Sequence, residues 1–157
     1  MSAITEILTV GHSTHQSDEF LELLRGAGIE ALVDVRRFPG SRRMPWFNEG
    51  ALRRSLTAAD IEYLHLAELG GRRGPAGLQG YAEHMVSGEF AAGLERLEAM
   101  ARRRATAVMC AEGQWRRCHR RLVADALVAH GWHVVHVGPG GEQEPHALQA
   151  AQASLDV

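Results

Sequence analysis

The residues best suited to chemistry lie close together late in the chain. Cys110 and Glu112 directly follow an apolar run. Cys118, His119 and Arg120 come at the start of a helical pattern. A thiol at a strand end, near cationic side chains and a helix N-terminus, is expected to have a lowered pKa, which favours the nucleophilic thiolate. We therefore predict Cys110 as nucleophile or electrostatic partner, Glu112 as an orienting group or base, and His119 as a proton carrier.

Other interpretations of these cysteines stay open. Cys110 is equally well explained as a small buried residue that ends a strand. The run from Cys110 to Arg116 has the cysteine, five residues, arginine spacing of phosphatase and sulfur-transfer loops, although Arg117 stands where such loops usually have Ser or Thr. The two cysteines with His119 and His12 offer four soft ligands, but the tight Cys-x2-Cys or His-x3-His spacing of zinc sites is missing. We predict neither a metal nor a cofactor.

Polar residues also follow three other apolar runs. In open parallel sheets, ligands bind beyond the carboxyl ends of the strands, so we expect these residues to meet in one arginine-rich anion pocket. His12 is a second candidate proton carrier, and Asp34 is expected to orient Arg36 or Arg37 by an ion pair, as a purely structural pair would also do. Ser13 is alternatively a helix cap. The binding residues expected from this reasoning are Gly11, Ser13, Asp34, Arg36, Arg42, Gly70, Gly71, Arg72, Cys118 and Arg120.

Elements that must position these residues follow from the hydrophobic pattern. Short apolar stretches rich in β-branched residues predict buried parallel strands at 7–10, 31–35, 63–66, 107–110 and 134–137. The expected helices begin at the caps Ser17 and Asn48, around residue 90 and near Cys118, and the first and last end at Gly26–Gly28 and Gly131. The segments 38–47 and 70–80 resist assignment and are expected above the carboxyl edge of the sheet.

Strands that alternate with helices predict an α/β fold, a three-layer αβα sandwich with a mostly parallel central sheet of about five strands. The 157 residues suit a single domain spanning 1–157, with a core at 5–138 and a peripheral tail at 139–157. This tail is expected to fray or to form a weak helix. Neither the strand order nor the oligomeric state follows from the sequence.

Composition narrows the class of protein. No apolar run approaches the roughly 20 residues of a membrane helix, so we expect no membrane partner and a cytoplasmic location with two free thiols. All 17 basic residues are arginines, and the net charge of −2 hides their clustering. Eight lie between residues 34 and 73, and seven lie between 102 and 121, where Glu112 is the single acid. Guanidinium groups grip phosphate or carboxylate through paired hydrogen bonds, although genome composition also favours arginine.

Five motifs occur in a fixed order: Val-Gly-His-Ser, Leu-Val-Asp-Val-Arg-Arg-Phe-Pro-Gly-Ser-Arg-Arg, His-Leu-Ala-Glu-Leu-Gly-Gly-Arg-Arg, Met-Cys-Ala-Glu and Cys-His-Arg-Arg. Over residues 7–137 the chain thereby resembles the bacterial and archaeal family called domain of unknown function 488. The resemblance implies a compact α/β domain with a shared site and no defined activity. It favours Arg120 over Arg116 as the anion ligand. The positions it carries over are Gly11, His12, Ser13, Asp34, Arg36, Pro39, Ser41, Arg42, Phe47, Asn48, Glu68, Gly70, Gly71, Arg72, Gly80, Tyr81, Cys110, Glu112, Cys118, His119 and Arg120. Of these, Tyr81 is expected as a further binding residue.

Three classes of function fit these residues. The leading hypothesis is an enzyme acting on a phosphate-bearing substrate, a nucleotide or nucleic acid. The rival is a nucleic-acid-binding module for DNA processing or repair, without catalysis, in which Arg42 and Arg43 contact phosphates and Trp46 and Phe47 stack on bases. The third is a redox or sulfur-handling protein in which the two cysteines pair.

Overall fold

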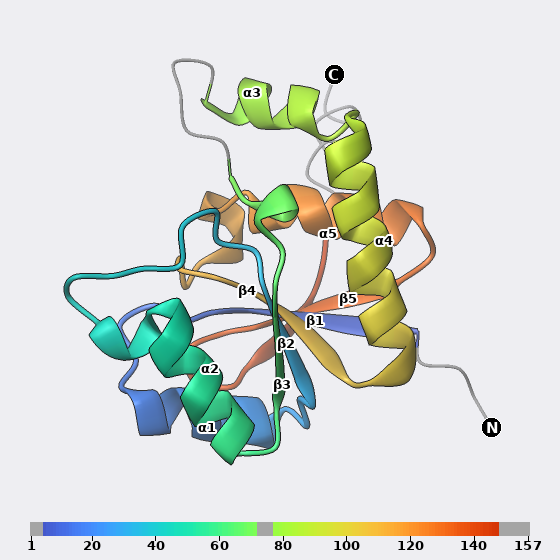
Figure 1. The fold of residues 1–157 in the computed structure, drawn as a ribbon. Helices are drawn as coiled ribbons and strands as arrows, with labels where there is room; N and C mark the ends of the chain where they lie inside the picture. Colours follow the sequence, from blue (N-terminus) through green and yellow to red (C-terminus); the bar gives the residue numbers. More distant parts are fainter. Residues whose placement is uncertain (1–4, 72–76, 148–157) are drawn as a thin grey trace.

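The structure, a computed structural model, describes residues 5–71 and 77–147. One six-stranded sheet runs through it in the order β3-β2-β4-β1-β5-β6 (Figure 1). Strands β1 to β5 are parallel, and β6 is antiparallel to β5. The elements in chain order are β1 (Glu6–Gly11), α1 (Ser17–Gly26), β2 (Ala31–Asp34), η1 (Pro45–Phe47), α2 (Glu49–Ala58), β3 (Glu62–His65), η2 (Ala67–Leu69), α3 (Gly77–His84), α4 (Gly88–Arg103), β4 (Thr106–Cys110), η3 (Trp115–Arg117), α5 (Arg120–Ala129), β5 (His133–Val137) and β6 (Gln143–Pro145).

Helices cover both faces of the sheet, and the central strands β2 and β4 are buried along their whole length. Successive side chains of a strand point to opposite faces. In β4, Val108 and Cys110 pack in the hydrophobic cluster of α4 and α5, whereas Ala107 and Met109 pack in that of α1 and α2. Figure 1 shows the same two layers, with α1 and α2 on one side of the sheet and α4 and α5 on the other. The predicted αβα sandwich with a mostly parallel sheet is confirmed.

All five predicted strands are present, each within one residue of its predicted bounds at either end. The expectation that the tail frays or forms a weak helix is wrong for residues 143–145, which form β6. This strand consists of exposed polar residues and Pro145, so it lacks the apolar signature of the others. Backbone pairing with β5 orders it, His146 N continues the pairing by donating to Val134 O over 2.9 Å, and Glu144 forms an ion pair with Arg116. The rest of the predicted tail, 148–157, lies outside the described residues.

The helices differ from expectation mainly at their first residues. Gln16, one residue before Ser17, is the N-cap of α1, and its backbone amide donates to Glu19 Oε1 over 2.8 Å. Asn48 occupies the N-cap of α2 as predicted. Helix α5 begins two residues after Cys118. The unassigned segment 70–80 contains the start of α3 at Gly77, and residues 72–76 of it lie outside the described part of the chain.

The strand order creates a crevice between β1 and β4. These neighbours are parallel, yet β1 leads into α1 on one face and β4 leads into α5 on the other. Such a switch point is where open α/β sheets bind ligands. Beyond the strands, His12 N donates to Cys110 O over 2.9 Å, and Ser13 N donates to Ala111 O over the same distance. The candidate site residues that follow β1 and those that follow β4 are therefore held side by side.

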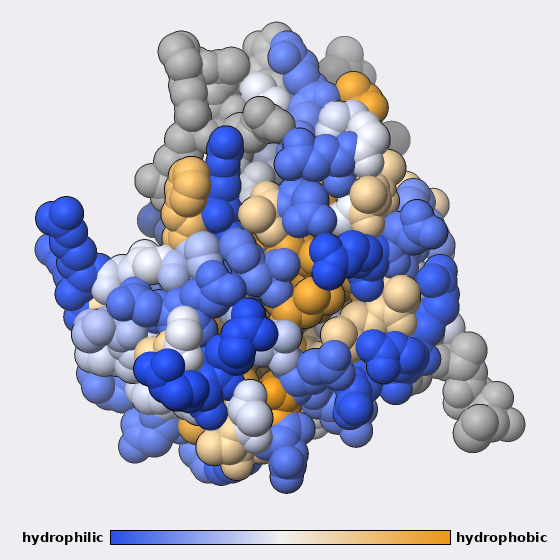
Figure 2. All heavy atoms as spheres, in the orientation of Figure 1, coloured by the Kyte–Doolittle hydropathy of each residue, from blue (hydrophilic) through white to orange (hydrophobic). Residues whose placement is uncertain are grey.

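The visible face in Figure 2 carries the β3 edge of the sheet and is mostly hydrophilic, with a few hydrophobic residues at its centre. Within residues 5–71 and 77–147, no helix has both the length and the apolar character that a membrane crossing requires.

Candidate active site

A cavity of about 920 Å³ opens at the carboxyl end of the sheet, where the turns after β1, β2 and β4 meet. Its lining comprises His12, Arg36, Arg37, Phe38, Gly40, Ser41, Met44, Gly71, Cys110, Ala111, Glu112, Arg117, Cys118 and His119. All four predicted catalytic residues are among them. So are three predicted binding residues, namely Arg36, Gly71 and Cys118. The expected convergence of distant turns is present in the structure.

Seven other predicted binding residues have different positions. Gly11 lies behind the wall, because a Cβ there would overlap the carbonyl group of Glu112. Gly70 packs against the backbone of Arg37, whose Cα would lie 2.7 Å from an added Cβ. Ser13, Asp34, Arg42, Tyr81 and Arg120 are absent from the lining. Arg72 lies outside the described residues.

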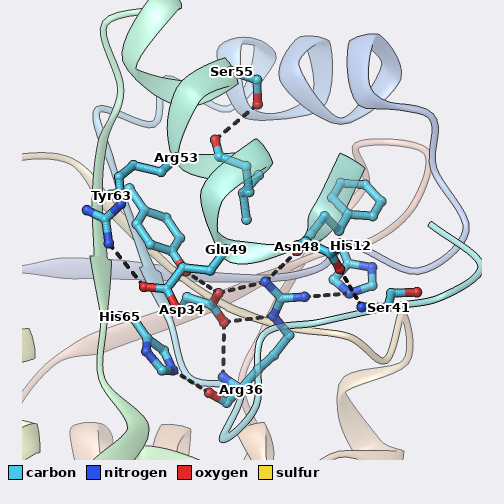
Figure 3. A network of polar contacts seen from close by, with 12 residues as sticks. His12, Asp34, Arg36, Ser41, Asn48, Glu49, Arg53, Ser55, Tyr63 and His65 are labelled. Carbon is cyan, nitrogen blue, oxygen red and sulfur yellow. Dashed lines mark hydrogen bonds and ion pairs between the residues drawn. The ribbon is translucent and has the colours of Figure 1, made fainter. Parts of the chain in front are cut away.

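Arg36 is held by an ion pair deep in the wall of the cavity (Figure 3). Its Nε and Nη2 donate to the two carboxylate oxygens of Asp34 over 2.9 and 2.8 Å, and Nη2 also donates to Phe47 O. The hydroxyl of Tyr63 donates to Asp34 Oδ2 over 2.6 Å. Asp34 is fully buried and Arg36 is 7 % exposed, so the pair is desolvated and internally compensated. The predicted ion pair exists, and it leaves Arg36 little free charge for a ligand.

His12 is a neutral imidazole in this arrangement. Its Nδ1 lies 3.0 Å from Ser13 O, which can only accept, so Nδ1 carries the proton. Its Nε2 lies 3.5 Å from Arg36 Nη1 and accepts from it. Burial lowers the pKa of His12, and the charge of Arg36 lowers it further. Stacking on Phe47, with ring centroids 4.3 Å apart, fixes the ring.

The sulfur atoms of the two cysteines are in direct contact in the cavity wall. Cys110 Sγ and Cys118 Sγ lie 2.9 Å apart, and Cys110 Sγ lies 3.4 Å from Glu112 O. Cys118 Sγ also accepts a hydrogen bond from the backbone amide of Arg120 over 3.4 Å, because Cys118 lies two residues before the first residue of helix α5. His119 Nδ1 lies 3.5 Å from the same sulfur.

These contacts and burial shift the pKa values of the two thiols in opposite directions. The hydrogen bond from Cys110 lowers the pKa of Cys118 well below its ordinary value, and His119 and the Arg120 amide lower it further. Burial raises the pKa of Cys110, which is 1 % exposed. The prediction that Cys110 has the lowered pKa is therefore wrong. Cys110 is buried from water at the end of the sheet, which disfavours its charged form, whereas Cys118 faces a helix N-terminus and is 9 % exposed.

His119 is oriented from three sides. Its Nε2 lies 3.3 Å from Val35 O, and because a carbonyl only accepts, Nε2 carries a proton. Its Nδ1 thus faces the sulfur of Cys118 and can exchange a proton with it. The ring lies 5.2 Å from that of Tyr81, whose hydroxyl donates to Leu69 O. At Gly71 an added Cβ would lie 3.0 Å from His119 Nδ1. Tyr81 and Gly71 thus both lie against the His119 ring.

Arg120, predicted as an anion ligand in preference to Arg116, is absent from the cavity lining and is 1 % exposed. Its Nη2 donates to Gly113 O over 3.4 Å, while Nε and Nη1 are buried with no hydrogen-bond partner in the described part of the chain. Its charge partly opposes the burial that raises the pKa of Cys110, and it adds to the burial that lowers the pKa of His136. Arg120 therefore adds positive potential behind the thiol pair without reaching the cavity.

Six lining residues were not predicted as site residues, namely Arg37, Phe38, Gly40, Met44, Ala111 and Arg117. Arg37 directly follows the predicted Arg36 in the sequence, so its neighbourhood was the available signal. Arg116, which supplied the phosphatase-like spacing, instead pairs with Glu144 at 2.6 Å and turns toward β6. Glu112 lines the cavity, and its Oε1 accepts from the amide of Gln114. No cluster of three or more potential metal ligands occurs among residues 5–71 and 77–147.

Fold and site together define an αβα protein with a hydrogen-bonded thiol pair at the switch point of its sheet. The chain belongs to the family described as Domain of unknown function DUF488, whose family model matches residues 16–127. The family suggested by the five motifs is thereby confirmed. No curated protein and no solved structure matches the chain.

Proposed function

We propose that this protein is a thiol-dependent enzyme in which Cys118 attacks a phosphate-bearing small molecule. The observation that carries the proposal is the position of the Cys118 sulfur. It lines the cavity and receives hydrogen bonds from Cys110 and from the Arg120 amide, which stabilise a thiolate. His119 is in contact with the same sulfur and serves as the proton carrier. A free thiolate also suits a reducing compartment such as the cytoplasm.

An anionic substrate follows from the charges around this sulfur. Arg37 and Arg117 line the cavity, and no ion pair within the described residues engages either of them. Arg36 is compensated by Asp34, so the two exposed arginines supply the positive charge. Guanidinium groups bind phosphate oxygens through paired hydrogen bonds.

A nucleotide is the substrate class that best fits the remaining wall. Phe38 lines the cavity and is 79 % exposed, and with the Arg37 guanidinium 5.4 Å from its ring centroid it offers a stacking surface for a base. A cavity of about 920 Å³ is in the range for nucleotide-sized ligands. The surfaces expected for a nucleic-acid module fit less well, since Phe47 is buried and Trp46 Nε1 is tied to His15 O.

Alkylation of the protein tests this assignment without knowledge of the substrate. Two reagents are compared, the anion iodoacetate and the neutral iodoacetamide. The ratio of their labelling rates, iodoacetate over iodoacetamide, is expected to be higher for Cys118 than for a free thiol in solution. Nucleoside monophosphates are expected to slow this labelling. Arg37→Gln and Arg117→Gln should each reduce the preference for iodoacetate by about tenfold. Arg42→Gln is the matched control, because Arg42 is exposed on the same loop as Phe38 and does not line the cavity.

Two outcomes contradict the proposal. One is labelling of Cys110 in preference to Cys118, and the other is a labelling rate that neither nucleotides nor the arginine variants change. Turnover of nucleotides, found by screening, should fall by about a thousandfold in Cys118→Ser. Full turnover in that variant would remove Cys118 as the nucleophile. Binding to oligonucleotides that weakens steeply with salt, without turnover, would favour the nucleic-acid module.

A further inference from the structure

The two sulfur atoms in the cavity wall have a geometry suited to a bond between them. Cys110 and Cys118 are the chain's two cysteines, and their Sγ atoms lie 2.9 Å apart. A disulfide needs a separation of about 2.05 Å, so an approach of less than about 1 Å suffices. Both thiols line the same solvent-connected cavity, which a small oxidant can enter.

The connecting segment already brings the two residues together. Residues 111–117 fold back through η3, where Arg117 N donates to Gln114 O and Cys118 N donates to Trp115 O. Trp115 is buried and stacks on His136 with ring centroids 4.0 Å apart, which anchors the turn to the sheet. No large backbone rearrangement is therefore needed to join the sulfurs.

We propose that Cys118 is a site of reversible oxidation and that Cys110 resolves the oxidised form as an intramolecular disulfide. In the first step the Cys118 thiolate attacks the distal oxygen of a hydroperoxide, the O–O bond breaks, and the alkoxide or hydroxide leaves with a proton from solvent. Cys118 becomes a sulfenic acid. In the second step Cys110 attacks this sulfur, loses its proton, and forms the S–S bond as water leaves. The hydroperoxide supplies both oxidising equivalents.

Arg120 favours the second step. Its guanidinium is 99 % buried beside Cys110, and two of its nitrogens have no partner among the described residues. A buried cation in this state stabilises an adjacent negative charge, which Cys110 must carry as it attacks. The completed disulfide removes the thiolate from the cavity. Oxidation would thus reversibly switch off any reaction that uses Cys118.

Intact-mass measurement of the full chain tests the proposal. After reduction and then one equivalent of hydrogen peroxide, the wild type should lose about 2 Da and regain it with dithiothreitol. Cys110→Ser should instead gain about 16 Da and react with dimedone at residue 118, because the sulfenic acid has no resolving thiol. Cys118→Ser should stay unchanged under the same treatment. Circular dichroism spectra that match the wild type show that both variants are folded.

Several results would overturn it. They are two unmodified thiols in the treated wild type, disulfides formed between chains only, or a Cys110→Ser variant that resists peroxide as Cys118→Ser does. The inference shares the Cys118 thiolate with the proposed enzyme activity, yet the two fail separately. Loss of nucleotide turnover in Cys118→Ser without a disulfide in the wild type supports the enzyme alone. A disulfide with full turnover in Cys118→Ser supports the oxidation site alone.

Discussion

Two thiols with the same intrinsic chemistry differ here because of their surroundings. Cys110 belongs to the end of β4, where neighbouring strands and the α4 and α5 layer bury it. Cys118 stands before α5 and accepts the amide hydrogen of Arg120, while His119 contacts it from the side. Each hydrogen bond to a thiolate lowers its pKa, and burial raises that of a thiol. The hydrogen bonds therefore lower the pKa of Cys118, while burial raises that of Cys110.

We expect His119→Gln to raise the pKa of Cys118 by about one unit. Glutamine can keep the contact to Val35 O through its amide but loses the group that faces the sulfur. The thiolate forms above its pKa, so the variant should lose iodoacetamide reactivity at mildly acidic pH, where the wild type keeps it. The rate of Cys118 labelling between about pH 4 and pH 9 measures the shift. His130→Gln, an exposed histidine near the end of α5, should leave the profile unchanged.

At the scale of elements, close approaches of backbone shape the cavity. The turn after β2 packs on the turn after η2, and Gly70 makes this contact possible, since a Cβ would lie 2.7 Å from Arg37 Cα. A second device fixes the loop that follows β2. Asn48 Oδ1 accepts from Ser41 N over 2.6 Å, which ties the loop to the start of α2. Both contacts position lining residues, Arg37 in one case and Ser41 in the other.

Gly70→Ala should therefore destabilise the fold by about 1–3 kcal/mol, because the added methyl group meets backbone that cannot move freely. Urea unfolding gives the free energy directly. Gly26→Ala is the matched control, since nothing lies within 4 Å of a Cβ at this last residue of α1. Alanine is the better helix former, so this control should be neutral or stabilising by up to about 1 kcal/mol. Equal effects of the two changes would contradict the steric argument.

At the scale of the whole molecule, a chain of buried polar groups ties the sheet to the end of the described tail. Thr9 Oγ1 lies 2.5 Å from His136 Nδ1, His136 Nε2 lies 2.8 Å from His146 Nδ1, and His146 Nε2 lies 2.6 Å from Asp125. Burial is the largest cause, and together with the charges of His146 and Arg120 it lowers the pKa of His136 to about 3. His136 is thus neutral in the folded protein.

Acid should weaken the fold through this histidine. Its contribution is complete above about pH 6.5, the ordinary pKa of an unfolded histidine, and is lost as the pH falls toward the folded value. The slope is at most about 1.4 kcal/mol for each pH unit. His12, whose pKa is also lowered, acts in the same direction. Urea unfolding at neutral and acidic pH measures how the free energy of unfolding changes with pH. This change should be smaller in His136→Gln than in wild type, whereas His133→Gln, an exposed position on the same strand, should show the wild-type change.

By itself, the sequence determined the local features of this protein. The five apolar strands, their alternation with helices and the polar residues at each strand end all depend on the order of neighbouring residues, so their prediction was sound. Strand β6 was not predicted, because it forms through backbone pairing with β5 and its side chains carry no apolar pattern.

Only the tertiary structure decided which of the predicted residues face a ligand and in what charge state. It placed β4 between β1 and β2, brought Cys110 within 2.9 Å of Cys118, compensated Arg36 with Asp34 and buried Arg120 beneath the cavity. Ionisation depends on solvent exposure and on charges from distant parts of the chain. Neither quantity is encoded in spacing, which is why the sequence favoured Cys110 and the fold favours Cys118.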